Sequence, residues 1–351
     1  MSNTNLFYLR PAPSAILALP PRLRGAILCR GRAGLRAAGA GGKEDGMPGR
    51  NHTASGMVAL AFWATSIAFT RALSEALGPV VLVAVSFGAG GLLALGLEWW
   101  RYGRIRALAP PSWPYLIWAG FFFVCYTAGY VPALAMAADR QVVLQLTIVN
   151  YLWPGLIVLG SVFFLQYRAR WYLLLPGLAV AFLGVTVCIA GEVSFGRLVA
   201  AAGGNAAAFA LMAGSAACWA VYSNLARKYA PANGASGVPL FQLAAGILFI
   251  LYAVFAGAQP VWSDGIFPPL AYYTVFVITL SYLLWDLAMQ KGNIVLLGVL
   301  SYFLPLISTL FAGWYLREPV SRSVLAGAAL VMLGAVLSRY GVAARRPVKP
   351  G

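Results

Sequence analysis

The pentapeptide NYLWP at residues 150–154 and the related SYFLP at 301–305 both lie deep within long apolar stretches. Each places an amide or hydroxyl side chain first, then a tyrosine, and a proline three residues after the tyrosine. Polar groups and helix-breaking prolines are costly inside an apolar segment. Their repetition therefore indicates that the two stretches perform a related task.

The composition excludes most soluble proteins. Of the 351 residues, 61% are hydrophobic and 10% are charged, and the mean hydropathy is +0.79. A soluble domain carries about 25% charged residues, so these residues cannot cover a water-facing surface. The formal charge of +16 would indicate a nucleic-acid partner in a soluble protein, but the basic residues here concentrate in tails and short loops. We therefore predict a polytopic membrane protein that contacts the lipid bilayer and binds no nucleic acid.

Ten apolar segments follow the first basic region, each of about 20 residues, the length that crosses about 30 Å of hydrocarbon as a helix. Backbone amides need internal hydrogen-bond partners within lipid, so these segments must be helical. The predicted class is all-α, with ten transmembrane helices. The predicted spans are 57–74, 79–98, 113–137, 142–165, 171–191, 206–227, 237–257, 269–289, 293–315 and 321–340.

Ten crossings place both termini on the same side of the membrane, and the charge distribution indicates which side. The terminal side carries 20 basic residues against 5 on the other side, or 12 against 5 when residues 1–56 are left out. Cytoplasmic loops are enriched in Lys and Arg. We predict a multi-pass inner-membrane protein with both termini in the cytoplasm.

The two ends of the chain differ from the apolar region between them. Residues 1–56 hold eight Lys or Arg and are rich in Gly, Ala and Pro, which predicts a disordered cytoplasmic tail. The alternative is that translation begins at Met47 or Met57. A second basic cytoplasmic tail is predicted at 341–351.

The two pentapeptides belong to a longer internal repeat. Alignment pairs Tyr151 with Tyr302 and Pro154 with Pro305. Further matched pairs are Trp63 with Trp219, Arg71 with Arg227, Gly177 with Gly327, and Gly184 with Gly334.

The order of these matches divides the chain into two five-helix halves, 57–191 and 206–340, joined by a periplasmic linker at 192–205. Because five is odd, the second half enters the membrane from the opposite side to the first. Inverted repeats of this kind surround a central cavity that opens to each side in turn. The alternative is chance similarity between apolar segments.

Polar and aromatic side chains share faces on several of the predicted helices. The residues of each pentapeptide recur at helical spacing, and a polar face on an apolar helix turns towards the bundle interior or a water-filled cavity. Tryptophan and tyrosine rings with a few hydroxyls and amides suit a flat amphipathic solute. The predicted substrate-binding residues are Trp63, Ser66, Tyr126, Tyr130, Asn150, Tyr151, Trp219, Tyr222, Tyr282, Trp285, Ser301 and Tyr302.

The two prolines mark related bends. Each removes one backbone hydrogen bond and clashes with the carbonyl four residues earlier. We predict that Pro154 and Pro305 act as hinges beside the cavity. The alternative is that they are fixed kinks that serve packing alone.

Asp286 is the only acidic residue well within a predicted span. One interpretation is a solvated carboxylate or one paired with Lys291, and the other is a role in proton coupling. The sequence holds no zinc-protease motif, no pair of intramembrane aspartates and no nucleotide-binding loop, so we predict no catalytic residue, metal site or cofactor, and no enzyme. Four cysteines are expected to be free thiols: Cys29, Cys125, Cys188 and Cys218.

Four stretches in this order resemble the drug/metabolite transporter superfamily of the EamA type. They are LSEALGPV at 73–80, NYLWP at 150–154, WDLAMQKGN at 285–293 and SYFLP at 301–305. The likeness covers residues 57–340 and is greatest to the bacterial aromatic amino acid exporters of that group. It implies ten helices in two inverted repeats around a central cavity. The chain departs from the family pattern at Asp286, at Lys291 and in CYTAGYVP at 125–132, which bears on the substrate.

The resemblance implies an inner-membrane exporter of Phe, Tyr and Trp that works by alternating access. The alternative within the class is an exporter of another small amphipathic metabolite or drug. Outside the class, the alternative is a membrane sensor or assembly protein that transports nothing. The expected partner is a small-molecule substrate, an amino acid or an amphipathic metabolite, and transport coupled to protons is one alternative. The expected assembly is a monomer or homodimer.

Overall fold

The computed structural model describes residues 48–105, 113–137, 140–190, 203–231, 234–308 and 322–343, together with residues 196 and 310. Contacts place Gly49–Gly351 in one compact unit. Predictions that concern Cys29, most of the tail 1–56 and most of the linker 192–205 lie outside the described residues.

Helices account for nearly all the described structure, and the predicted all-α class is confirmed. The first half contains α3 (Pro48–Leu77), α4 (Pro79–Tyr102), a π-helical segment η2 (Tyr115–Ala119), α5 (Gly120–Ala135), α6 (Arg140–Asn150), α7 (Trp153–Phe164), β1 (Arg168–Ala169) and α8 (Trp171–Ala190). The second half contains α10 (Ala206–Lys228), α11 (Val238–Phe255), η3 (Asp264–Ile266), α12 (Phe267–Tyr272), η4 (Tyr273–Leu280), α13 (Ser281–Lys291), α14 (Ile294–Leu300), η5 (Ser301–Phe303), α16 (Arg322–Gly341) and β2 (Val342–Ala343). The two strands form one short antiparallel ladder.

Eight helices within the described ranges are long and apolar enough to cross a membrane. They are Pro79–Trp100, Tyr115–Ala135, Gln145–Phe164, Trp171–Ile189, Ala206–Lys228, Val238–Phe255, Asp264–Lys291 and Arg322–Gly341. The other two predicted spans correspond to α3, which is not among the eight, and to the shorter apolar helix Ile294–Ser308. The protein is thus a polytopic membrane protein, while the count of ten stays a prediction.

The connection between the first two helices explains one of the sequence motifs. Gly78 has a φ of 76°, a conformation that glycine adopts without the steric cost that other residues meet. Its backbone N–H bonds to the Ser74 carbonyl at 2.9 Å and ends α3. Pro79 then occupies the first turn of α4, where its missing N–H costs nothing. The Gly-Pro pair of LSEALGPV therefore makes a sharp reversal between two helices.

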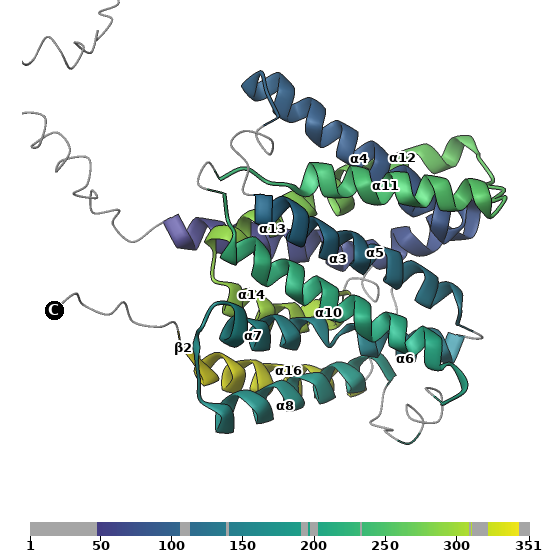
Figure 1. The fold of residues 1–351 in the computed structure, drawn as a ribbon. Coiled ribbons are helices and arrows are strands. Elements are labelled where there is room, and N and C mark those ends of the chain that lie inside the picture. Colours follow the sequence, from purple (N-terminus) through teal and green to yellow (C-terminus); the bar gives the residue numbers. More distant parts are fainter. Residues whose placement is uncertain are drawn as a thin grey trace, which may run out of the picture. The chain divides into compact units, whose positions relative to one another are not determined.

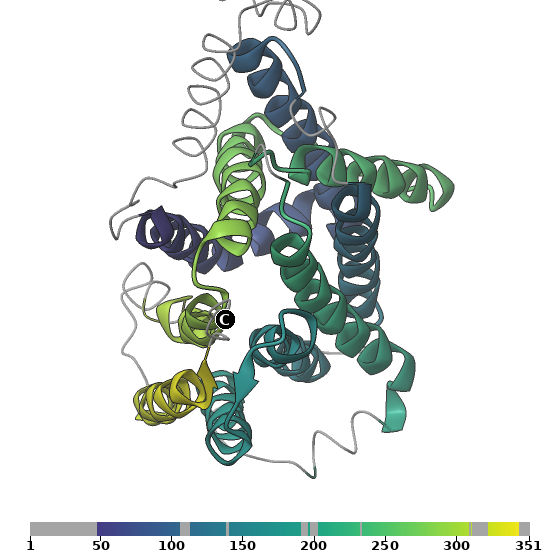
Figure 2. The same cartoon turned by 60° about the vertical axis from the view of Figure 1, so that its left-hand side comes forward.

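Helices that hold the same place in the two predicted halves pack against each other. The second predicted helix, α4, packs on the seventh, α11, and the fifth, α8, packs on the tenth, α16. Helices α8 and α16 lie side by side in both views, whereas α4 and α11 cross each other (Figures 1 and 2). Likewise α7, from the fourth span, packs on α14, from the ninth. Pairing of this kind is compatible with a two-fold relation between the halves, but α5, from the third span, packs on α10, from the sixth. The inverted repeat stays a prediction.

The α8–α16 pair approaches closely because both helices carry glycine at the contact. A Cβ placed on Gly334 would lie 2.3 Å from the Ala181 nitrogen, and one on Gly184 would lie 2.6 Å from the Val331 nitrogen. Small residues let backbones approach in membranes, where van der Waals packing drives helix association. Two of the glycines matched in the sequence repeat therefore hold this pair of helices together.

Both pentapeptides interrupt their helices. Helix α6 ends at Asn150, residues Tyr151 and Leu152 form a turn, and α7 starts at Trp153 with Pro154 in its first turn. In the second half, α14 ends at Leu300 and a 3₁₀ turn covers Ser301–Phe303. Each helix is thus interrupted beside its proline, whereas bending there and movement as hinges stay predictions.

The first described helix starts earlier than predicted, and the described cysteines are free thiols. Helix α3 begins at Pro48, nine residues before the predicted start at Met57, so His52 lies inside it. Within the described part of the chain, the three cysteines Cys125, Cys188 and Cys218 are free thiols, as predicted.

Candidate functional site

A pocket of about 220 Å³ lies between the helices of both halves. Residues of α3, α5, α6, α10, η4 and α13 line it, together with the two interrupted regions, and none of its described lining residues is charged. The lining residues are Trp63, Ser66, Thr70, Tyr126, Tyr130, Thr147, Asn150, Tyr151, Trp153, Trp219, Tyr273, Val277, Ile278, Tyr282, Leu304 and Ser308. We call this space the central pocket.

The polar groups of the central pocket differ in how far their hydrogen bonds are satisfied. Ser66 donates to the Trp63 carbonyl at 2.6 Å, and Thr70 donates to the Tyr273 hydroxyl at 3.2 Å. The amide oxygen of Asn150 is buried and has no partner among the described residues. A buried acceptor without a partner is costly, so this oxygen is available to a donor that enters the pocket.

Aromatic rings close one end of the central pocket. The Trp63 ring lies 5.7 Å from Trp219 and 5.2 Å from Trp285, and Trp153 lies 5.7 Å from Trp285. Tyr282 joins the group at 5.3 Å from Trp63. Trp285 is fully buried behind these rings and donates from Nε1 to the Ser223 hydroxyl at 3.3 Å. We call these five residues, Trp63, Trp153, Trp219, Tyr282 and Trp285, the aromatic layer.

A buried carboxylate lies immediately beyond the aromatic layer. Asp286 has no exposed surface, and its two oxygens accept four hydrogen bonds. The donors are the Tyr115 hydroxyl at 2.8 Å, the Tyr222 hydroxyl at 3.0 Å, the Ser236 hydroxyl at 2.8 Å and the Gln290 amide at 2.8 Å. The network joins η2, α10, α13 and the connection that leads into α11.

This arrangement corrects the sequence interpretation of Asp286 as a solvated carboxylate or one paired with Lys291. The carboxylate is buried, and neutral donors satisfy it. Its neighbour along α13, Gln290, supplies one of these donors, whereas Lys291 is exposed and its ammonium lies close to Gly234. A role in proton coupling stays a prediction.

The central pocket contains eight of the twelve residues predicted to bind substrate. These are Trp63, Ser66, Tyr126, Tyr130, Asn150, Tyr151, Trp219 and Tyr282. The other four are buried elsewhere: Tyr222 in the Asp286 network, Trp285 in the aromatic layer, Ser301 bonded to the Leu297 carbonyl at 2.7 Å, and Tyr302 with its hydroxyl against Gly155. The substrate-binding role of all twelve stays a prediction.

The helices that carry the two pentapeptides contact each other beside them. Tyr302 lies against Gly155, and a Cβ on Gly298 would lie 3.2 Å from the Pro154 carbonyl. The interrupted region of each half therefore packs on a glycine next to the other, beside the central pocket.

Several lining residues were not predicted, among them Trp153. In a regular helix, Trp153 would point about 200° away from Tyr151. The structure has a turn at Tyr151–Leu152, where the Leu152 N–H bonds to the Val149 carbonyl at 3.1 Å, and both rings line the same pocket. The lining residues Thr70 and Thr147 lie on helical faces with predicted residues, a signal that could have included them.

A second pocket lies beyond the Asp286 network. It has a volume of about 590 Å³ and is lined by residues that include Arg227, Lys291 and Arg339. Helix α10 carries Trp219 of the central pocket, Tyr222 of the network and Arg227 of the second pocket. Trp219 and Arg227 are eight residues apart, about 12 Å along a helix. A closed aromatic and hydrogen-bonded barrier thus separates two spaces along shared helices.

Comparisons with known proteins agree with this geometry. The EamA-like transporter family matches residues 206–340. The aromatic amino acid exporter YddG of Salmonella typhimurium is 31% identical over 295 residues, which cover 83% of this chain and 97% of that protein. The protein of the same name from Escherichia coli K12 is 29% identical, with 81% and 95% covered.

Two further matches extend the likeness. The protein named aromatic amino acid exporter YddG in Ancylobacter novellus is 30% identical, with 74% of this chain and 86% of that protein covered. A solved crystal structure superposes with a TM-score of 0.70 at 26% identity, with 83% of this chain and 97% of that chain covered.

Proposed function

The chain belongs to the EamA-like transporter family, and on this premise we propose that it exports aromatic amino acids across the inner membrane by alternating access. The observation that carries the proposal is the pair of pockets at two different levels of shared helices, with the aromatic layer and the Asp286 network between them. One closed barrier between two spaces is the arrangement that alternating access requires.

The central pocket suits a small aromatic zwitterion. Its volume of about 220 Å³ falls below the roughly 300–1,000 Å³ of pockets for drug-sized ligands. Tryptophan and tyrosine rings can stack on an aromatic side chain and attract an ammonium group. The unpartnered amide oxygen of Asn150 can accept a hydrogen bond from the same ammonium. An uncharged lining also suits a zwitterion, because the solute that passes the barrier then carries no net charge.

The sidedness of the protein follows from the positive-inside rule. We place the pocket with Arg227, Lys291 and Arg339 on the cytoplasmic side, and the open end of the central pocket on the periplasmic side. In this state the barrier is closed towards the cytoplasm. Export would require the Asp286 network to part and the two proline bends to shift, and protonation of Asp286 is the candidate coupling step. We propose no catalytic reaction.

The test is flux in proteoliposomes that contain the purified protein. Labelled Phe, Tyr and Trp should exchange across the membrane, whereas labelled acidic amino acids should not. Transport of neutral amphipathic drugs without these amino acids would favour the alternative substrate class. Absence of flux for every solute would indicate a non-transporting membrane protein.

A matched pair of variants assigns the pocket. Trp219→Ala removes a ring worth about 1.4 kcal/mol or more to a stacked aromatic solute, so flux at low substrate should fall roughly tenfold. Trp100→Ala changes a tryptophan that is 82% exposed, and it should leave flux unchanged. Equal effects of the two variants would refute the assignment.

A further inference from the structure

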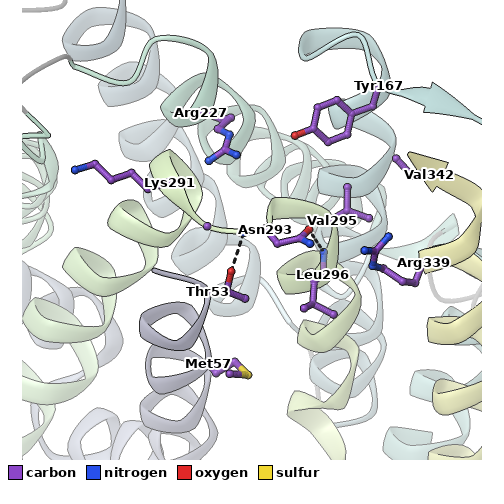
Figure 3. Close-up of a pocket in the computed structure, with 11 residues that line it drawn as sticks. Thr53, Met57, Tyr167, Arg227, Lys291, Asn293, Val295, Leu296, Arg339 and Val342 are labelled. Atoms are coloured by element: carbon purple, nitrogen blue, oxygen red, sulfur yellow. Dashed lines mark hydrogen bonds between the residues drawn. The ribbon is translucent and has the colours of Figure 1, made fainter. Parts of the chain in front are cut away.

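The pocket beyond the Asp286 network has the chemistry of an anion site. Arginine and lysine side chains from three helices line it: Arg227 of α10, Lys291 of α13 and Arg339 of α16. Tyr167 and Asn293 add a hydroxyl and an amide, and no acidic residue occurs among its described lining residues. Figure 3 shows the Arg227 and Arg339 side chains around Asn293, with the Tyr167 hydroxyl directed towards Arg227. We call this space the basic pocket.

The cations of the basic pocket lack a counter-ion within the described residues. Asp286 is buried and lies five residues before Lys291 in the sequence. Its carboxylate already accepts four hydrogen bonds from neutral donors. Arg227 donates from Nη1 to the Gln290 carbonyl at 2.6 Å, which fixes the guanidinium at the end of α13. A guanidinium has five N–H donors, so most of those on Arg227 remain for another acceptor. Like charges around one space repel each other, and an anion bound between them relieves this repulsion.

The positive-inside rule explains why basic residues lie at this end of the helices, but it does not explain why they converge. Arg227 and Arg339 are far apart in sequence, and yet both line one concave space of about 590 Å³. The Lys291 side chain, at the edge of this space, is directed away from them (Figure 3). Random placement at a membrane surface would leave such residues pointing separately into water. Planar guanidinium groups match the geometry of carboxylate and phosphate oxygens.

The same pocket also has an apolar wall. Met57 of α3, Val295 and Leu296 of α14, and Val342 of β2 lie opposite or beside the charged groups. Asn293 is held in place at this wall, because its backbone N–H bonds to the Thr53 hydroxyl at 2.9 Å and its side chain accepts from the Leu296 N–H at 3.0 Å (Figure 3). A ligand with one anionic group and one apolar group would satisfy both parts.

From these observations we propose that the basic pocket is a loading site, where Arg227 and Arg339 bind the carboxylate of the solute before the barrier opens. This inference rests on the proposed function, because it assigns the same solute to a second site. The apolar wall would hold the aromatic side chain. The shared ligand chemistry is an oxyanion, and a lipid phosphate group is the competing source that the experiment must separate.

The test measures uptake of labelled Phe into inside-out membrane vesicles, so that the cytoplasmic face receives the solute. Arg339→Gln should raise KM about fivefold or more and leave the maximal rate within twofold, because the loading site lies outside the barrier. Arg322→Gln, an exposed arginine at the other end of the same helix α16, is the control and should change neither value. Equal KM values for Arg339→Gln and the wild type would overturn the inference.

A second comparison identifies the group that is bound. Phenethylamine lacks the carboxylate of Phe, so it should compete weakly against labelled Phe in the wild type. In Arg339→Gln, the inhibition constant of unlabelled Phe should be at most fivefold lower than that of phenethylamine. If Phe keeps its full advantage, the arginine does not bind the carboxylate and the inference fails.

A lipid arm separates the two sources of the oxyanion. The purified protein is reconstituted in phosphatidylcholine alone or with added phosphatidylglycerol. A raised KM of Arg339→Gln in both lipids supports binding of the solute, whereas an effect confined to the anionic lipid assigns the site to a lipid phosphate and overturns the inference. If the wild type transports no aromatic amino acid in any lipid, the proposed function itself fails, which is a different result from a normal KM in the variant.

Discussion

Replacing Asp286 by asparagine should open the barrier towards the basic pocket. The substitution keeps the size and shape of the side chain but removes the charge that four donors share. Three of the donors, from Tyr115, Ser236 and Gln290, bond to Oδ2, and Tyr222 alone bonds to Oδ1. An asparagine with its NH₂ group at the Oδ1 position can therefore keep the geometry, because the Tyr222 hydroxyl can turn to accept.

The magnitude follows from the strength of the bonds. A hydrogen bond to a charged group contributes roughly 1.5–3 kcal/mol and a neutral one roughly 0.5–1.5 kcal/mol, so four weakened bonds lower the stability of the closed state by about 4–6 kcal/mol. The asparagine also avoids the cost of burying a charge, which returns part of this loss. A net effect of about 1.4–2.8 kcal/mol corresponds to a ten- to hundredfold larger open fraction.

The assay is the rate at which a cytoplasmic maleimide reagent labels a cysteine placed within the barrier. Ala226 has no exposed surface and lies on α10 between Tyr222 and Arg227, so Ala226→Cys reports opening. The background lacks the four native cysteines. When opening is fast relative to labelling, the rate follows the open fraction. Tyr222→Phe, which removes one donor, should raise the rate by a smaller factor.

Asp264→Asn is the control, because this aspartate is exposed at the start of Asp264–Lys291, the segment that also contains Asp286. It should leave the labelling rate unchanged. A folded Asp286→Asn protein that labels at the wild-type rate, together with an unchanged Tyr222→Phe, would refute the idea that the network holds the barrier closed.

Two further predictions concern packing and the bends. Gly334→Leu should sharply lower the yield and melting temperature of the folded protein in detergent, because its Cβ would lie 2.3 Å from the Ala181 nitrogen; Gly96→Leu, where a Cβ meets nothing within 4 Å, should not. Tyr151→Ala should raise the KM for transport while the protein stays folded, since Tyr151 lines the central pocket, whereas Tyr302→Ala should mainly lower the melting temperature, since Tyr302 packs on Gly155. The opposite outcome for the two tyrosines would contradict the placement of the pocket.

The pattern of apolar segments was enough to predict the fold class, because lipid leaves the backbone few alternatives to a helix. It was also enough to locate the two interruptions, since a proline removes a helical backbone hydrogen bond. The sequence did not show which way each side chain points beside an interruption. Trp153 and Tyr302 illustrate this, because the first lines the central pocket and the second packs on Gly155.

The surroundings of Asp286 could not be predicted for a different reason. Its donors come from residues 115, 222, 236 and 290, and three of the four lie on other segments. No local pattern connects them. Lys291 was the candidate partner because it is close in sequence, but position 290 lies one helical turn from Asp286 and therefore on the same face. Helical spacing alone would have favoured Gln290 over Lys291.

The placement of charge in the two pockets has a common physical cause. An arginine in the central pocket would help to bind a carboxylate, but it would have to stay buried without a partner whenever the pocket was empty and closed, which is costly in a low-dielectric interior. At the mouth of the bundle, water can solvate Arg227 and Arg339 between binding events. An exporter that first selects the carboxylate at a wet site and then passes a net-neutral zwitterion to an uncharged aromatic pocket avoids that cost. On this reasoning Asp286 can remain inside because its four donors move apart only when water can replace them. A structure with the barrier open towards the basic pocket should therefore show water or solute in place of at least two of the four donors.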